Sequence, residues 1–219
     1  MNNEIMLNFF GSDAGFGEKN NSAYYEKDNE IYIIDCGFTV FQEIRKNIDF
    51  SKYKKINIII THLHNDHAGS LSQVILLAWF AYNKKVNVIS HCENIEKYLE
   101  ITGTPKDTYE VKKELDNLKF IKTDHVKELD CYGFVWKVNG KKIVYTGDTY
   151  TLEPYMESLK NADEFYTDIS KNGGVHLKFD DVYEQLKNIK QNGTKVILIH
   201  IDDKKYIEEK SNNEFIIIK

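Results

Sequence analysis

The chain has 219 residues, of which 42% are apolar and 13% aromatic, and only two prolines. This composition indicates a folded globule, excludes a disordered chain, and leads us to expect a single domain over residues 1–219. The net charge of −5, with lysines alternating with acids as in residues 112–114 and 202–205, weighs against a partner as long and anionic as a nucleic acid.

The first half of the chain alternates short apolar runs with polar loops. In chain order it predicts strands at 4–10 and 30–35, a helix at 41–46, a strand at 56–60, a helix at 70–82 and a strand at 86–90. Residues 93–117 are polar and are expected to be helical, with a lid over a pocket as one use for them.

The second half is richer in strands. It predicts strands at 118–122, 133–138, 142–145 and 164–167, a helix at 180–189, and strands at 195–200 and 214–218. Asn139-Gly140 between two of these strands is a hairpin signal. Strands early and late with helices between them favour an α/β or α+β layered domain.

The cysteines and the N-terminus bear on the compartment. The chain has an odd number of cysteines, and they lack CxxC spacing; they are Cys36, Cys92 and Cys131. A disulfide framework is therefore not expected, which favours a reducing compartment. The N-terminus has no basic segment followed by an apolar one, and the apolar run 74–82 is too short to span a bilayer. We therefore expect a cytoplasmic protein with no membrane segment.

Three histidines and an acid lie within six positions, directly after the apolar strand expected at 56–60. The run HLHNDH at 62–67 holds three of the seven histidines in the chain, so a chance surface cluster is a poor explanation. Imidazole nitrogens and carboxylate oxygens are ligands that Zn²⁺ and related divalent ions accept. The run therefore predicts a metal site.

This run resembles the HxHxDH signature of the metallo-β-lactamase superfamily, and later segments resemble that superfamily's other motifs in their usual order. These segments are IIDCG with Asp35, His125 ahead of Tyr132, YTGDT with Asp148, and VILIH with His200. The resemblance covers about residues 7–200. It implies an α/β fold of the αββα type, in which two mixed sheets are covered by helices.

The resemblance also implies a set of seven ligands for two divalent ions. One ion would take His62, His64 and His125, the second would take Asp66, His67 and His200, and Asp148 would bridge both. Asp35 would support the ligands from behind. Zinc is the expected metal, although manganese also suits two carboxylates, and a water or hydroxide between the ions would be the nucleophile.

Within the superfamily, the opening segment LNFFGSDAGFGEKNNSAYY resembles the ribonuclease Z-like phosphodiesterases. Asp168 lies where those enzymes carry the acid of a His-Glu-Ala-Thr motif, and His176 follows. The resemblance implies that Asp168 and His176 form a proton-relay pair near the leaving group, with Asp66 as a further catalytic carboxylate. The chain departs from the motif, because Asp replaces Glu and no histidine precedes it.

The spacing between His125 and Asp148 separates two groups of relatives. Members that process transfer RNA carry a long flexible arm there, whereas this chain has only about two dozen residues. Relatives without the arm include viral and bacterial enzymes that open cyclic mononucleotides, among them anti-Pycsar proteins. The resemblance therefore implies a small phosphodiester or cyclic nucleotide as substrate.

Other functions stay open at this point. They are a ribonuclease Z-like endonuclease, a hydrolase of a carbon ester, lactone, thioester or lactam, and a non-catalytic sensor. The complete ligand set weighs against the sensor.

Other residues of note are expected to have structural roles. His91 and Cys131 are interpreted as structural, and Tyr132 and Phe134 as packing residues. The helix at 70–82 is apolar on most faces, so it is buried in the core or against a partner; relatives pair through this region, which implies a homodimer.

Overall fold

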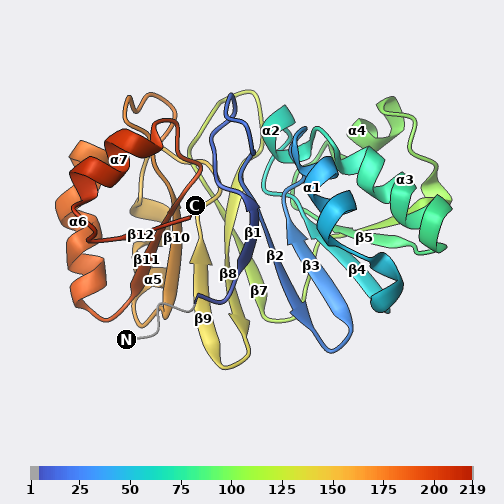
Figure 1. Ribbon diagram of the computed structural model, residues 1–219, viewed down its shortest axis with the longest axis horizontal. Helices are drawn as coiled ribbons and strands as arrows, with labels where there is room; N and C mark the ends of the chain where they lie inside the picture. The colour runs from blue at the N-terminus through green and yellow to red at the C-terminus, as the bar shows by residue number, and fades with distance from the viewer. Residues whose placement is uncertain (1–4, 219) are drawn as a thin grey trace.

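Two six-stranded β-sheets lie face to face in the computed structural model, which describes residues 5–218, and helices cover the outer face of each sheet (Figure 1). The predicted αββα arrangement is confirmed. Each half of the chain supplies one sheet, and each sheet starts with three antiparallel strands and continues with parallel ones.

The first sheet runs in chain order from edge to edge. Its strands are β1 (Asn8–Gly11), β2 (Ser22–Lys27), β3 (Glu30–Ile34), β4 (Lys55–Ile59), β5 (Val86–Ile89) and β6 (Tyr109–Lys112). Its helices are α1 (Val40–Asn47), α2 (Asn65–Ala68), α3 (Leu71–Tyr82) and α4 (Ile95–Ile101). Short 3-10 turns lie at Phe50–Lys52 and Lys106–Thr108.

The second sheet is also ordered along the chain. Its strands are β7 (Leu118–Lys122), β8 (Tyr132–Val138), β9 (Lys141–Tyr145), β10 (Glu164–Asp168), β11 (Lys195–Ile199) and β12 (Ile216–Ile217). Its helices are α5 (Met156–Leu159), preceded by a 3-10 turn at Glu153–Tyr155, α6 (Phe179–Gln191) and α7 (Lys204–Ser211).

The isoleucines of β4, which Asn57 interrupts, are explained by burial on both faces of the sheet. Ile56 and Ile58 pack toward the helices that cover the first sheet. Ile59 points the other way, into the core between the two sheets, where it joins residues such as Phe134 and Tyr166 of the second sheet. Successive side chains of a strand point to opposite faces, so a central strand of a parallel sheet is apolar at nearly every position.

Several predicted elements need correction. Residues 109–112 form the edge strand β6, so the helical prediction for 93–117 holds only for α4. The strand β2 and the helix α7 were not predicted. The charged stretch 202–205 starts α7, because the Asp203 carboxylate accepts from the Tyr206 amide at the helix N-terminus. Position 4 of the first expected strand lies outside the described residues.

The Asn139-Gly140 hairpin is confirmed between β8 and β9. Both residues have positive φ, 49° and 75°, as a tight two-residue turn of this kind requires. Among residues 5–218, no helix is both long and apolar enough to cross a membrane.

Candidate metal centre

The predicted ligands come together at one edge of the sandwich, where strands of both sheets end. His62, Asp148 and His200 follow the carboxyl ends of β4, β9 and β11, respectively. The carboxyl ends of parallel strands form the usual binding edge of an α/β sheet. Each half of the chain thus supplies part of one site, which explains why its residues are so far apart in the sequence.

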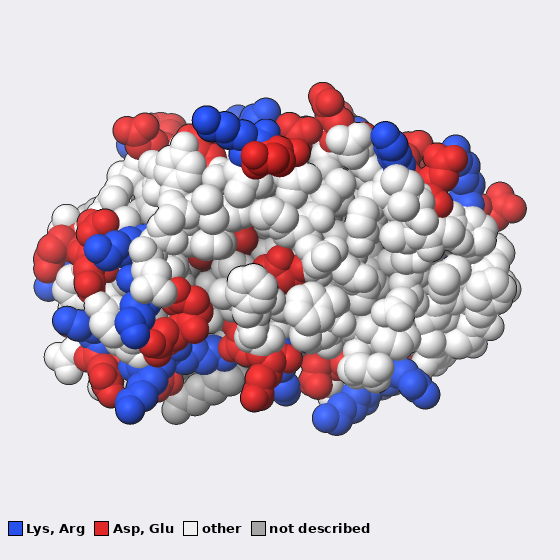
Figure 2. Space-filling view, turned by 90° about the horizontal axis from the view of Figure 1, so that it is seen from above, with Lys and Arg blue, Asp and Glu red and all other residues white. Residues whose placement is uncertain are grey.

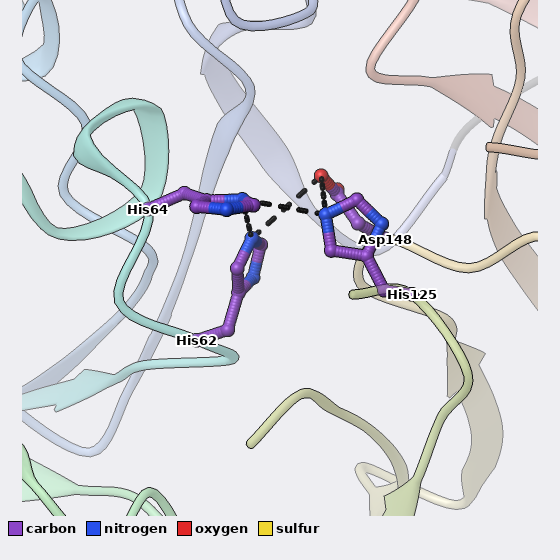
Figure 3. A group of neighbouring side chains, drawn as sticks. All are labelled: His62, His64, His125 and Asp148. Atoms are coloured by element: carbon purple, nitrogen blue, oxygen red, sulfur yellow. Dashed lines mark hydrogen bonds and ion pairs between the residues drawn. The ribbon is translucent and has the colours of Figure 1, made fainter. Parts of the chain in front are cut away.

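One group of four side chains converges on a single point (Figure 3). His64 Nδ1 lies 3.0 Å from His62 Nε2 and 3.3 Å from His125 Nε2. Asp148 Oδ2 lies 3.7 Å from each of those two Nε2 atoms. Four ligands about 2.0–2.1 Å from a tetrahedral zinc ion would be about 3.3 Å apart, so the group has the dimensions of such a site.

A second group shares the same Asp148 oxygen. Asp148 Oδ2 lies 3.2 Å from His67 Nε2 and 3.5 Å from His200 Nε2. Asp66 Oδ2 lies 3.3 Å from His67 Nε2 and 3.1 Å from His200 Nε2. The structure therefore brings all seven predicted ligands into two adjoining groups, with Asp148 common to both.

Unpaired buried atoms and shifted histidine pKa values indicate that these two groups of side chains are suited to bind cations. His67 Nε2 and Asp148 Oδ1 are buried without a hydrogen-bond partner among the described residues, a state that bound ions relieve. Burial, together with His67, holds the pKa of His62 well below its usual value, so the His62 ring is neutral and able to bind a metal. Burial opposes a charge on His67, yet Asp148 and Asp35 raise the pKa of His67. The second group of side chains, which contains His67, therefore attracts positive charge.

Asp35 lies directly behind the ligands, as predicted. Its Oδ2 accepts from His67 Nδ1 at 2.9 Å, and its Oδ1 accepts from the Thr61 amide at 2.9 Å. The first contact turns His67 Nε2 toward the metal point, which is how carboxylates orient metal-binding histidines. Asp35 and His200 have positive φ values of 60° and 52°, so the backbone is strained at the site itself.

Asp168 and His176 also meet. His176 Nδ1 donates to Asp168 Oδ2 at 2.9 Å, so the substitution of Asp for Glu does not break the contact. Asp168 Oδ1 lies 3.4 Å from His200 Nδ1, a contact that was not predicted. Burial opposes a charge on His176, but Asp168 outweighs it and raises the pKa of His176 above its usual value.

A cavity of about 800 Å³ opens over the two groups, which is within the usual range for small-ligand sites. Figure 2 looks down on this edge, where acidic atoms lie inside a hollow with a mainly uncharged rim. Neither Lys nor Arg is among the described residues that line it. Residues 93–117 do not line it either, so the suggested lid role is wrong for the described structure.

The lining includes residues that the sequence did not single out, among them Phe16, Phe38 and Val175. The Val175 carbonyl accepts from His125 Nδ1 at 2.8 Å and so orients that ring. His91 and Cys131 have structural contacts, as interpreted: His91 Nε2 donates to the Lys113 carbonyl, and Cys131 is a buried free thiol.

Comparisons with known proteins agree with this site. A family model described as anti-Pycsar protein Apyc1 matches residues 5–99 and 90–219. The anti-Pycsar protein Apyc1 of Bacillus phage 010DV004 is 25% identical over an alignment of 237 positions, which covers 93% of this chain and 91% of that protein. The same protein of Bacillus phage BSP38 is also 25% identical, over 90% of this chain and 89% of that one.

The fold is shared with solved structures. The metallo-β-lactamase fold protein YhfI from Bacillus subtilis superposes with a TM-score of 0.78 at 17% identity, covering 97% of this chain and 95% of that one. Together with the two His/Asp groups, the family match confirms the predicted family and enzyme class. The chain belongs to the anti-Pycsar Apyc1 family and is a metal-dependent phosphodiesterase with the metallo-β-lactamase fold.

Proposed function

We propose that this protein hydrolyses the ring phosphodiester of a cyclic mononucleotide. Bound divalent cations would supply a water of lowered pKa and would neutralise charge on the phosphoryl oxygens. The seven ligands from both sheets would hold them, with Asp148 between the two positions. Zinc is the metal we propose, since three imidazoles and a carboxylate at tetrahedral spacing suit it, and manganese is the alternative.

The observation that carries the proposal is the Asp168–His176 pair beside these ligands. His176 Nδ1 is held by Asp168 at 2.9 Å and lies 3.9 Å from Asp148 Oδ2. Because Nδ1 is engaged, His176 Nε2 is the ring atom left to serve the substrate. When a water gives one proton to the solvent and the resulting hydroxide bonds to phosphorus, the P–O bond to the ribose oxygen breaks, and that oxygen leaves as an alkoxide that needs a proton. His176 Nε2 would donate it.

The lining of the cavity favours a small substrate of low charge. A cyclic mononucleotide carries one negative charge, which the metal positions alone can neutralise. A polynucleotide would need basic side chains for its flanking phosphates, and no Lys or Arg is found among the described lining residues. This observation weighs against the endonuclease alternative.

The experiment is a substrate panel with defined metals. We expect the metal-loaded protein to hydrolyse adenosine 3′,5′-cyclic phosphate and bis-p-nitrophenyl phosphate, and to leave a lactone and a β-lactam unchanged. A structured transfer-RNA precursor should also remain uncut. Turnover of the lactone or lactam alone would place the protein among the carbon-ester and lactam hydrolases instead.

We also propose that the protein forms a homodimer through α3. One face of this helix packs on the first sheet through Leu71, Val74 and Ile75, whereas Phe80 is 76% exposed. The end of the molecule at which α3 lies carries few charged side chains on the face seen in Figure 2. Leu76 and Trp79, which are four and one residues before Phe80, are only partly buried, and a contiguous exposed apolar patch of this kind marks an interaction site. Sedimentation should give a dimer for the wild type and a monomer for Phe80→Glu, and a monomeric wild type would refute the proposal.

A further inference from the structure

Two Gly-Phe dipeptides pack against the same metal ligand, Asp66. A Cβ atom at Gly15 would lie 3.0 Å from Asp66 Oδ2, and one at Gly37 would lie 2.0 Å from the Asp66 carbonyl oxygen. A side chain at Gly37 would collide with the Asp66 backbone, and one at Gly15 would crowd the Asp66 carboxylate, so glycine suits both positions. In each loop the next residue is a phenylalanine, Phe16 or Phe38, and both phenylalanines line the cavity over the metal groups.

A buried asparagine ties these two loops together. The Asn20 side chain is fully buried, and its Nδ2 donates to the Gly15 carbonyl at 3.3 Å. Its Oδ1 accepts from the Thr39 amide at 3.1 Å, and the Asn20 amide donates to Thr39 Oγ1 at 2.8 Å. The backbones that carry the two phenylalanines are therefore positioned relative to each other and to Asp66.

The rings themselves are not part of the core. Phe16 has a relative exposure of 108% and Phe38 of 52%. Phe16 also borders a smaller hollow of about 400 Å³ beside the main cavity, so its ring has space on both sides. A fully exposed phenyl ring on a well-anchored loop contributes little to folding, which leaves a ligand as the reason for its position.

We infer that Phe16 and Phe38 form an aromatic clamp that stacks on the base of the nucleotide while its phosphate lies at the metal positions. The inference rests on the proposed function and specifies which part of the substrate these residues bind. A base presents a flat π-face of the kind that aromatic side chains stack on. With no Lys or Arg among the described lining residues, stacking is the interaction the rim offers to an uncharged base.

The test compares adenosine 3′,5′-cyclic phosphate with 1,2-dideoxyribose 3′,5′-cyclic phosphate, which has the same sugar-phosphate ring but no base. Phe16→Ala should lower kcat/KM for the nucleotide by about 5- to 150-fold, the range for one lost base–aromatic stack, mainly through KM. Turnover of the abasic compound should not change. Phe38→Ala should behave alike, and Phe16→Tyr should restore the wild-type value.

Ile101→Ala is the control, because Ile101 is also a large apolar side chain, 75% exposed, but lies on α4, away from the proposed dimer contact at Phe80, and does not line the cavity. It should leave both substrates unaffected. Equal losses on both substrates for Phe16→Ala, or no loss on either, would overturn the clamp. Failure of the wild type to hydrolyse any cyclic nucleotide would instead refute the proposed function.

A binding measurement separates stacking from an indirect effect on turnover. Phe16→Trp places an indole at the tip of the loop, and adding the slowly hydrolysed phosphorothioate of the cyclic nucleotide should quench its fluorescence. Ile101→Trp should show no such quenching, because Ile101 is exposed but does not line the cavity. Quenching that is equal in both variants, or absent from both, would contradict the clamp.

Discussion

Asp148→Ala should lower kcat/KM for adenosine 3′,5′-cyclic phosphate by at least about 10³-fold. A single oxygen of Asp148, Oδ2, lies within 3.7 Å of the facing nitrogens of His62, His67 and His125 and within 3.5 Å of His200 Nε2. Removing it leaves both groups without their shared anionic ligand. Loss of residues that only orient metal ligands already costs about 10- to 100-fold, so loss of a bridging ligand should cost more.

Metal content gives the second readout for this variant. Elemental analysis should find close to two divalent ions per wild-type chain and fewer in Asp148→Ala. Asp148→Asn, which keeps the shape of the side chain but removes its charge, is the second variant should the alanine protein fail to fold. Asp107→Ala, an exposed acid outside the site, should keep wild-type values. Near-normal turnover in a folded Asp148 variant, or a wild type with only trace metal that added metal does not activate, would refute the assignment.

The ligands were predictable because their signal is local. Four of the seven lie within residues 62–67, and Asp148 and His200 each end a recognisable strand motif. The apolar runs of buried strands such as β4 predicted only a layered α/β or α+β domain, and the αββα arrangement was implied by the resemblance that these motifs carry. Local patterns of this kind survive in a single sequence.

The residues that were missed depend on packing between distant segments. Phe16 and Phe38 are separated in the chain, and only the shared contact of Gly15 and Gly37 with Asp66 brings them to one cavity. The support of His200 by Asp168 depends likewise on the parallel pairing of β10 with β11. The edge strand β6 is short and half exposed, so it lacks the apolar run that identifies a central strand.

His176→Ala should lower kcat by about 10²–10⁴-fold for a cyclic nucleotide, which loses an alkoxide, the usual contribution of a positioned general acid. It should lower kcat far less for bis-p-nitrophenyl phosphate, because p-nitrophenolate departs readily without a proton. His176 is held by Asp168 at 2.9 Å and lines the cavity, and Asp168 raises its pKa despite partial burial, so the ring keeps the proton it must give.

The control for this variant is His91→Ala, since His91 binds the Lys113 carbonyl and does not line the cavity. It should leave both substrates unaffected. The metal content of His176→Ala should equal that of the wild type, because His176 is outside the seven-ligand set. Equal losses on both substrates would show that His176 binds substrate or supports the structure rather than donating a proton. Loss of metal would show that the ligand set itself is misassigned, because the third His/Asp group, which joins His176 to Asp148, Asp168 and His200, would then hold an ion.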